Sequence, residues 1–527
     1  MLFRKIKSGT IKPGRKDRKG SLRRNRFFYV LNHKTRVFLF FFHGSRLDNN
    51  TRERYIISQR FRLNHGNVES CGPALKNKNQ TQGIIMKPSK AVPMNPISAM
   101  DFIPQEQLHS LQLARLREMV SLAYANVPLF KARLEERGVK PDDIQKLEDI
   151  RLLPFTVKAD LRDTYPFGLF ASPMEDIVRL HASSGTTGKP IVVAYTRQDL
   201  DVWSTAVARA LAAVGVHEGD IAQISYGYGL FTGGLGAHSG FEKIGATVIP
   251  ASGGNTERQV MLMKDFGVTC VACTPSYFLH MIETAEKMGV DMRELPVRLG
   301  IFGAEPWTEA MRSQIEKKSG IRAYDIYGLS EIVGPGVGCS CLEQEGLHIF
   351  EDYFYPEIID PATGEVLPDG QEGELVLTTL AKHAMPMIRY RTRDITSIMT
   401  SKCACGRTIR RISKIGRRSD DMFIIRGVNV FPTQIETAIL SVESVLPVYQ
   451  IILTRDHGLD NIEVDIEVNE TIFHDRVSAI EDIRHTISHA IERILGIRVF
   501  VKMCAPNSIP RSEGKAKRVI DRRNLNA

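Results

Sequence analysis

Short apolar runs alternate with amphipathic segments through the middle of the chain, and this alternation restricts the fold more than any other feature of the sequence. Segments such as Arg258 to Phe266 and Ser276 to Met288 repeat apolar side chains at helical spacing. Strands that alternate with helices predict a largely parallel sheet covered by helices, with ligands at the carboxyl ends of the strands. The runs with the length of buried strands are Ile221 to Ser225, Thr247 to Pro250, Val268 to Thr274, Leu299 to Phe302 and Ala323 to Ile326.

The segments on either side of this region indicate further domains, because a chain of 527 residues is too long for one simple core. Residues 105–137 predict amphipathic helices, and residues 354–415 combine strand and turn signals that predict a β-rich part. A boundary follows near Arg418 to Met422. After it we expect a small α+β domain with a helix over 431–440, strands over 448–453, 462–468 and 498–503, a helix over 475–494 and a polar tail.

A run of hydroxyl-bearing, glycine and basic residues precedes the first of these strands: Ser183-Ser184-Gly185-Thr186-Thr187-Gly188-Lys189-Pro190. Glycine allows the backbone to approach a bulky anion, so that N–H groups, hydroxyls and the ammonium of Lys189 can surround a polyphosphate. The spacing differs from that of the common P-loop, which has four residues between its glycine and the Gly-Lys pair. In isolation the run is equally typical of a polar surface loop.

Four further motifs follow in a fixed order: Tyr327-Gly328-Leu329-Ser330-Glu331, Tyr390-Arg391-Thr392-Arg393-Asp394, Gly416-Arg417-Arg418-Ser419-Asp420-Asp421 and Pro510-Arg511-Ser512-Glu513-Gly514-Lys515. Together with the hydroxyl-rich run, they resemble the adenylate-forming superfamily of acyl-coenzyme A synthetases, luciferases and peptide-synthetase adenylation domains. The resemblance covers residues 94–527. Within the superfamily, Tyr226 to Gly234, Phe302 to Trp307 and Arg426 to Pro432 are similar to the phenylacetate-coenzyme A ligase group.

The resemblance implies the α/β fold of adenylate-forming enzymes. We expect a large N-terminal domain over residues 94–419, including the β-rich part over 354–415, and a small mobile C-terminal α+β domain over 420–527. It also implies an acid-thiol ligase that uses ATP and Mg²⁺ to form an acyl adenylate, and then transfers the acyl group to coenzyme A. The expected place of action is the cytoplasm, in phenylacetate catabolism, and a homodimer is an open alternative to a monomer.

The resemblance also assigns roles to single residues. Lys515, Glu331 and Lys189 are the expected catalytic residues, with Mg²⁺ held by Glu331 and a domain hinge at Asp420. The expected phosphate-binding residues are Ser183, Ser184, Gly185, Thr186, Thr187, Gly188 and Lys189. The expected adenine and ribose contacts are Gly303, Ala304, Glu305, Asp325, Tyr327, Gly328, Asp394 and Arg418. Taken singly, Glu331 or Asp394 is more typical of a surface carboxylate or a helix cap, so the assignment depends on the whole set.

The expected acid pocket is formed by Tyr226, Phe231 and Ala304, which match family positions around an aromatic ring. An apolar pocket with aromatic walls favours an aryl group, and phenylacetate is the first choice. The alternatives are indoleacetate, a hydroxyphenylacetate or a benzoate. A further alternative is an adenylating enzyme that loads a carrier-protein thiol.

Positive charge is concentrated at the start of the chain. Residues 1–93 hold 22 Lys and Arg against 4 Asp and Glu, whereas the whole chain has a formal net charge of +10. The apolar runs in this arm are too short for a membrane span and do not form a secretory signal. The arm is interpreted as a disordered segment, a nucleic-acid or membrane-surface contact, or the result of a start assigned too early, with Met94 or Met86 as the true beginning. Nucleic-acid binding through the arm is the non-enzyme alternative, and residues 94–527 predict neither a nucleic-acid nor a membrane partner.

Eight cysteines in a chain without an export signal predict reduced thiols. Cys403 and Cys405, with Cys341 and His348, can offer three thiolates and an imidazole to a structural zinc ion, as in some relatives of this ligase group. Cys339 competes with Cys341, and unliganded cysteines are an equal alternative. Cys270 and Cys273 lie in an apolar strand pattern and are expected in the core.

Overall fold

The computed structural model describes residues 95–183, 190–419, 421–425, 428–442, 445, 448–456, 459–468, 477–511 and 516–523. Before residue 95 it describes only the backbone of four short strands. There β1 (Val30–His33) pairs antiparallel with β2 (Arg36–Leu39), and β3 (Phe61–Asn64) pairs antiparallel with β4 (Asn67–Ser70). The chain divides into two units, residues 1–90 and 91–527, and the remaining elements belong to the second unit.

A nine-stranded sheet forms the centre of the second unit, in the order β17-β18-β13-β12-β11-β10-β9-β7-β8. The five predicted strands are confirmed as β7 (Ile221–Ile224), β8 (Thr247–Ile249), β9 (Cys270–Cys273), β10 (Leu299–Phe302) and β11 (Arg322–Leu329), and they pair in parallel. An antiparallel extension follows with β12 (Val333–Cys339), β13 (Leu347–Ile349), β17 (Ile398–Met399) and β18 (Arg411–Ile412). The sheet is therefore mixed, and its parallel half sets the carboxyl ends side by side.

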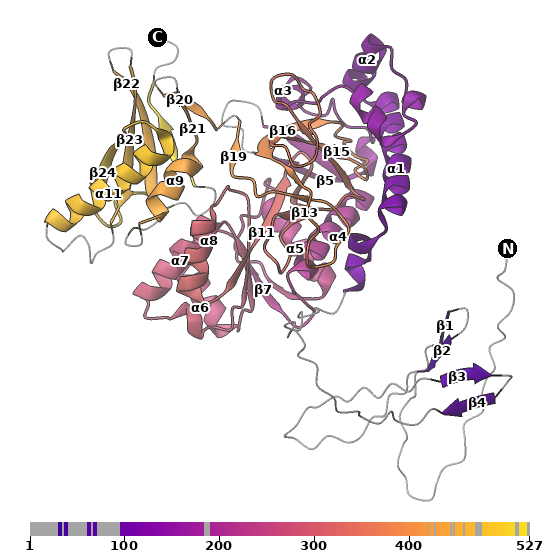
Figure 1. The fold of residues 1–527 in the computed structure, drawn as a ribbon, viewed down its shortest axis with the longest axis horizontal. Coiled ribbons are helices and arrows are strands. Elements are labelled where there is room, and N and C mark those ends of the chain that lie inside the picture. Colours follow the sequence, from indigo (N-terminus) through magenta and orange to yellow (C-terminus); the bar gives the residue numbers. More distant parts are fainter. Residues whose placement is uncertain are drawn as a thin grey trace, which may run out of the picture. The chain divides into compact units, whose positions relative to one another are not determined.

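Helices cover both faces of the parallel strands (Figure 1). On one face α4 (Arg197–Ala213) and α5 (Gly233–Ile244) pack into a core that includes Cys270 and Ala272. On the other face α6 (Thr256–Asp265), α7 (Pro275–Lys287) and α8 (Glu309–Ser319) pack into a core that includes Val271 and Cys273. Successive side chains of β9 thus point to opposite faces. The predicted core positions of Cys270 and Cys273 are confirmed, since both are fully buried.

The predicted helical region after residue 104 consists of α1 (Gln105–Asn126) and α2 (Pro128–Arg137). The chain breaks between them because Pro128 cannot continue the hydrogen bonding of α1, although it suits the first turn of α2. Gly138, at φ 66°, ends α2 in the left-handed conformation. The other helical elements before residue 300 are η1 (Pro96–Phe102), η2 (Pro141–Asp143), η3 (Leu147–Leu152), α3 (Lys158–Asp163), η4 (Met174–Asp176) and η5 (Met292–Glu294).

The predicted β-rich part is confirmed as an antiparallel sheet of β14 (Phe354–Ile359), β15 (Gly373–Thr379), β16 (Tyr390–Thr396) and β19 (Arg417–Arg418). The Asp360 side chain accepts the backbone N–H groups of Ala362 and Thr363 at 2.8 Å, which fixes the predicted turn there. A separate hairpin of β5 (Ile177–Ala182) and β6 (Val192–Thr196) encloses the hydroxyl-rich run. In the antiparallel sheet, the pairing of β16 with β19 sets Asp394 opposite Arg418.

The C-terminal residues form an α+β domain, shown in orange and yellow in Figure 1. The hairpin β20 (Phe423–Ile425) and β21 (Val428–Val430) leads to α9 (Pro432–Leu440). The sheet has the order β24-β23-β22-β25, and its core is shared with α9 and α11 (Val477–Leu495). Its strands are β22 (Tyr449–Asp456), β23 (Leu459–Glu467), β24 (Phe500–Cys504) and β25 (Val519–Asp521).

The prediction of a polar tail was wrong at β25, which pairs in parallel with β22. Val519 and Ile520 lie between charged neighbours, and two apolar residues are too short a run to predict a strand. They form a strand because they pair with the edge of β22.

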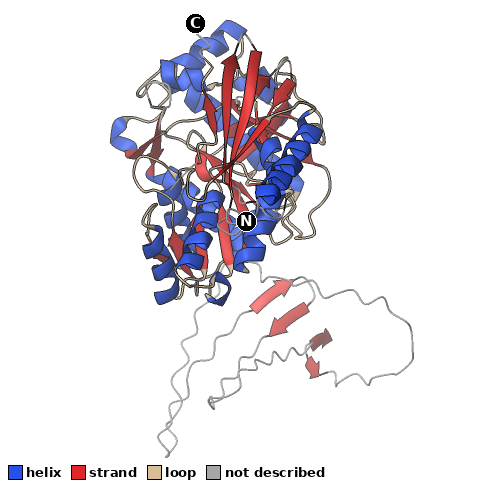
Figure 2. Cartoon of the chain, turned by 90° about the vertical axis from the view of Figure 1, so that its left-hand side faces the viewer, coloured by secondary structure: helices blue, strands red, loops and turns tan. Residues whose placement is uncertain are grey.

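Figure 2 shows the strands of the chain in red and its helices in blue. Among the described helices, none combines the length and apolar character needed to cross a membrane.

A buried ion pair between α4 and the first residues of the unit predicts a large effect on stability. Arg209 is 1% exposed and binds Asp101 at 2.8 Å and Asp352 at 2.9 Å. Arg209→Ala removes the buried cation that Asp101 and Asp352 share, although Arg407 still binds Asp101 and Arg115 still lies 3.7 Å from Asp352. It should reduce the free energy of unfolding by about 3–5 kcal/mol, measured by urea denaturation. The control Arg293→Ala removes an exposed pair with Asp291 and should change stability little. Equal effects of the two variants would contradict this interpretation.

Candidate active site

A cavity of about 730 Å³ lies at the carboxyl ends of the parallel strands. Ser225 and Tyr226 follow β7, Thr274 follows β9, and Ala304 follows β10. The last residues of β11 complete this side of the wall. The cavity therefore occupies the place at which the topology predicts a ligand.

The cavity gathers predicted residues from motifs that are far apart in the chain. Those that line it are Ser183, Tyr226, Phe231, Ala304, Gly328, Glu331 and Arg418. Gly303, Glu305, Asp325, Tyr327 and Asp394 do not line it. Ser184, Gly185, Thr186, Thr187, Gly188, Lys189, Asp420 and Lys515 lie outside the described residues. The predictions for this last set stay untested by geometry.

The β5–β6 hairpin carries the hydroxyl-rich run to the cavity. Ala182 and Ser183 at the end of β5, and Pro190 and Ile191 before β6, all line the cavity. The backbone N–H of Ser183 donates to Ile191 at 2.9 Å, and that of Ala182 donates to Leu230 at 2.9 Å. Both ends of the run are thus fixed at the cavity wall.

Asp394 forms the centre of a buried polar group beside the cavity. The Tyr327 hydroxyl donates to its Oδ2 at 2.6 Å, and the Arg418 guanidinium lies 3.4 Å from its Oδ1. Burial, followed by the neighbouring Asp394 charge, raises the pKa of Tyr327 well above its usual value, so the hydroxyl stays a donor. Asp394 is therefore held as an oriented carboxylate, with Arg418 between it and the cavity.

Glu331 is buried apart from a face toward the cavity, with 7% of its surface exposed. The buried Lys382 ammonium donates to the backbone carbonyl of Glu331 at 2.8 Å and lies 4.8 Å from the centre of the Tyr195 ring. Burial lowers the pKa of Lys382 to about 8. Among the described residues that line the cavity, Glu331 has the only carboxylate. Lys382 fixes the backbone of this residue.

The aromatic side of the cavity comes from the loop after β7. Tyr226 is buried, whereas Phe231 is 43% exposed and Leu230 is 68% exposed, and all three line the cavity. A Cβ at Gly233 would overlap the Phe231 ring, so glycine is needed for the ring to lie against the start of α5. These side chains give the cavity an apolar wall that suits an aryl group.

The Gly303-Ala304-Glu305 segment follows β10. Ala304 adopts φ 71°, and a Cβ at Gly303 would overlap the carbonyl oxygen of Ile326 on β11. The Glu305 carboxylate is engaged by backbone, since it accepts N–H groups from Ser276 at 2.8 Å and from Ala516 at 3.2 Å. Asp325 lies on β11, and burial of its carboxyl group raises its pKa. Of the segment, Ala304 is the residue that faces the cavity.

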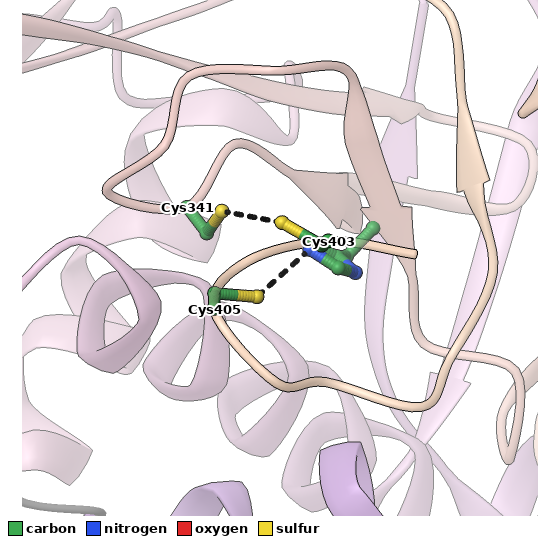
Figure 3. A group of neighbouring side chains, drawn as sticks. Cys341, Cys403 and Cys405 are labelled. Atoms are coloured by element: carbon green, nitrogen blue, oxygen red, sulfur yellow. Dashed lines mark hydrogen bonds between the residues drawn. The ribbon is translucent and has the colours of Figure 1, made fainter. Parts of the chain in front are cut away.

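Three thiols and one imidazole converge in the antiparallel part of the sheet. The thiols of Cys341, Cys403 and Cys405 face one another (Figure 3), and with His348 their ligand atoms all lie within 4.8 Å. The Cys341 and Cys403 sulfurs are 3.6 Å apart, and Cys405 Sγ is 3.3 Å from His348 Nε2. Sulfurs around tetrahedral zinc are separated by about 3.8 Å.

The imidazole orientation also fits a metal ligand. His348 Nδ1 lies 3.3 Å from the carbonyl oxygen of Ile409, an arrangement that leaves Nε2 directed at the thiols. Of the two competing cysteines, Cys341 is the one that joins the cluster. The donor set therefore fits a closed structural zinc site.

Comparison with known proteins agrees with this geometry. Residues 103–381 match the family described as AMP-binding enzyme, and residues 427–523 match the AMP-binding enzyme C-terminal domain. A phenylacetate-coenzyme A ligase of Pseudomonas putida is 52% identical over 81% of this chain and 97% of its own. One of Escherichia coli K12 is 51% identical over 80% of this chain and 96% of its own.

The chain belongs to the phenylacetate-coenzyme A ligase family. Among solved structures, it resembles a 2-hydroxyisobutyryl-coenzyme A ligase in complex with an acyl adenylate, with a TM-score of 0.76 and 29% identity over 80% of this chain and 91% of that one. The expected fold is thus confirmed: an adenylate-forming enzyme with an N-terminal AMP-binding domain and a C-terminal domain.

Two lysines and one arginine near the site belong to no sequence motif that would predict their position. Lys158 and Arg162 of α3 line the cavity, and Lys382 lies behind Glu331. The start of α3 reaches the cavity because Thr156, just before the helix, forms a parallel β-bridge with Tyr390 of β16. Nothing in the sequence near residue 158 signals this distant pairing.

The close packing at Gly303 predicts a specific effect of one added methyl group. Gly303→Ala forces the backbone away from Ile326 and should lower the free energy of unfolding by about 1–3 kcal/mol. It should also weaken nucleotide binding, measured by calorimetry with ATP, because Ala304 must move with it. The control Gly416→Ala meets no atom within 4 Å and should have little effect on stability. A stable Gly303→Ala variant with unchanged ATP binding would contradict this interpretation.

Proposed function

We propose that this protein joins phenylacetate, or a closely related arylacetic acid, to coenzyme A through an acyl-adenylate intermediate. The products are phenylacetyl-coenzyme A, AMP and pyrophosphate. The observation that carries the proposal is a single cavity in which an aromatic wall meets Glu331, Arg418 and both ends of the hydroxyl-rich run. The family and the relatives named above support the same reaction.

In the first step, a carboxylate oxygen of the acid attacks the α-phosphorus of ATP. The bond from that phosphorus to the oxygen bridging it to the β-phosphorus breaks, and pyrophosphate leaves. We assign Thr186, Thr187 and Lys189 to the β- and γ-phosphates, with Lys158 and Arg162 as further cations of the cavity. Glu331 would hold Mg²⁺, which neutralises phosphate charge when bound. Asp394 would accept the ribose hydroxyls, with Arg418 beside it.

In the second step, the thiol of coenzyme A attacks the acyl carbon and AMP leaves. We propose that the C-terminal domain turns about Asp420 between the two steps, so that Lys515 serves adenylation alone. The acid itself is placed by Tyr226, Phe231 and Ala304. Such a pocket distinguishes acids that differ by one methylene by only about 1–3 kcal/mol. Cytoplasmic action in aromatic-acid catabolism is part of the proposal, and a homodimer stays an open alternative to a monomer.

A panel of aryl acids tests the proposed function directly. The protein is incubated with ATP, Mg²⁺ and phenylacetate, indoleacetate, 4-hydroxyphenylacetate or benzoate, and pyrophosphate release is measured. Phenylacetate should give the highest kcat/KM, and added coenzyme A should yield the aryl thioester. Pyrophosphate release without a coenzyme A thioester would favour the carrier-protein alternative. No release with any acid would refute the proposal.

Lys515→Ala should separate the two half-reactions. Pyrophosphate release should fall by orders of magnitude, because the charge that contacts the carboxylate and α-phosphate is lost. Thioester formation from supplied phenylacetyl adenylate and coenzyme A should persist. The control is Lys517→Ala, two residues on and exposed, which should leave both steps unchanged. Equal losses in both steps would contradict a role in adenylation alone.

We also propose a structural zinc ion held by Cys341, His348, Cys403 and Cys405. The convergence of four donor atoms and the orientation of His348 support it. The Cys403 to Thr408 loop also holds the first residues of the unit, since Arg407 binds the Asp101 carboxylate at 3.0 Å. A metal there would join this loop to β12 and β13.

Protein purified under reducing conditions without chelators should contain about one zinc per chain by elemental analysis. Cys405→Ser should lose the zinc and lower the thermal midpoint, because a ligand is removed from a closed site. Cys504→Ser changes a cysteine outside the cluster and should keep both. A metal-free protein with full stability would show that the cysteines are unliganded.

A further inference from the structure

Two carboxylates of the N-terminal domain contact the C-terminal domain on either side of the segment that contains Lys515. Arg511 Nη2 lies 3.3 Å from Glu283 Oε2 on α7. The backbone N–H of Ala516 donates to Glu305 Oε2 at 3.2 Å. Residues 512–515 themselves lie outside the described part of the chain. The residues that flank the predicted catalytic lysine are therefore each bound to a different carboxylate.

Both carboxylates belong to one surface. Glu283 lies on α7, and Glu305 accepts the N–H of Ser276 in the first turn of the same helix at 2.8 Å. Further along α7, the Lys287 ammonium donates to Asn507 at 3.1 Å. Side chains of α7 and residues 509–511 and 516–518 also line one narrow cleft. Helix α7 with Glu305 thus forms a docking surface for the loop that leads to Lys515.

The contact with Glu283 can break without leaving the Arg511 guanidinium unpaired. The Arg511 guanidinium is also held inside its own domain by Glu467, at 2.6 and 2.8 Å. Glu467 in turn accepts the N–H groups of Asn507 and Ile509, which fixes the loop before Arg511. The shorter bonds lie within the C-terminal domain, and the longer 3.3 Å contact crosses to α7. Of the two Arg511 interactions, separation of the domains therefore breaks only the weaker one.

Glu305 has the same arrangement on the other side. Its Oε1 receives the shorter bond from Ser276, within the N-terminal domain, and its Oε2 receives the longer one from Ala516. Burial alone would raise the pKa of Glu283, but His280, whose Nδ1 lies 3.9 Å away, and the charge of Arg511 lower it, so Glu283 stays an anion. Arg511 and Glu305 therefore each bind one partner within their own domain and a second, releasable partner in the other domain.

We infer that Glu283 and Glu305 are positioning residues that hold Arg511 and Ala516, the described residues on either side of Lys515, in place during adenylation and release them before thioester formation. The inference rests on the proposed function and deepens it, because it names what fixes one of the two domain arrangements. These two contacts should raise the adenylation rate by roughly tenfold.

The test compares both half-reactions in Glu283→Gln, which keeps the size of the side chain and removes its charge. Pyrophosphate release should fall by about tenfold, and thioester formation from supplied phenylacetyl adenylate should stay at the wild-type rate. Glu286→Gln is the matched control, since Glu286 is exposed on the same helix, and it should change neither step. Glu305→Gln should give the same separation as Glu283→Gln. An intact second step shows in each case that the variant is folded.

Two results would overturn the inference. One is wild-type adenylation in Glu283→Gln, and the other is an equal loss in both steps. The wild-type protein is assayed beside the variants, with the acid from the aryl panel that it adenylates fastest. If it adenylates none, the proposed function fails and the inference fails with it. If it does adenylate an acid and Glu283→Gln matches Glu286→Gln, the inference alone fails.

Discussion

The pairing of parallel strands β7, β9, β10 and β11 is the constraint on which the site depends. In a parallel sheet all carboxyl ends meet at one edge, so loops that are distant in sequence are forced together there. The aromatic loop after β7, the Gly303 segment after β10 and Glu331 after β11 meet only for this reason. Elements that are not part of the parallel sheet bring most of the charged groups of the site to this edge.

Those added elements supply most of the charge. The β5–β6 hairpin brings the hydroxyl-rich run, α3 brings Lys158 and Arg162, and β19 brings Arg418. The register of β16 against β19 matters most, because a slip by one residue would turn Asp394 or Arg418 to the opposite face. Backbone pairing in the β-rich part thus determines which charges reach a cavity built by the parallel sheet.

Sequence patterns predicted the elements whose signals are local. The five parallel strands, the paired helices after residue 104 and the core positions of Cys270 and Cys273 follow from apolar periodicity over a few residues. Long-range pairing leaves no such signal. The approach of α3 to the cavity, the contact of buried Lys382 with Glu331 and strand β25 all depend on partners more than 50 residues away. The choice of Cys341 over Cys339 in the cysteine cluster likewise needed three-dimensional positions.

At Arg511 and Glu305, the hydrogen bonds within each of the two domains are shorter than those that join the domains at their interface. Inside each domain, carboxylates such as Glu467 and the first oxygen of Glu305 accept short hydrogen bonds that never need to open. Across the interface, Arg511 and the second oxygen of Glu305 make longer bonds, to Glu283 and to the backbone N–H of Ala516. The mechanism proposed above presents a lysine for one step and withdraws it for the next, and such a mechanism needs contacts of moderate strength. Fully buried ion pairs such as Arg209 with Asp101 would hold the domains in one arrangement, and in the described residues they lie within the N-terminal domain.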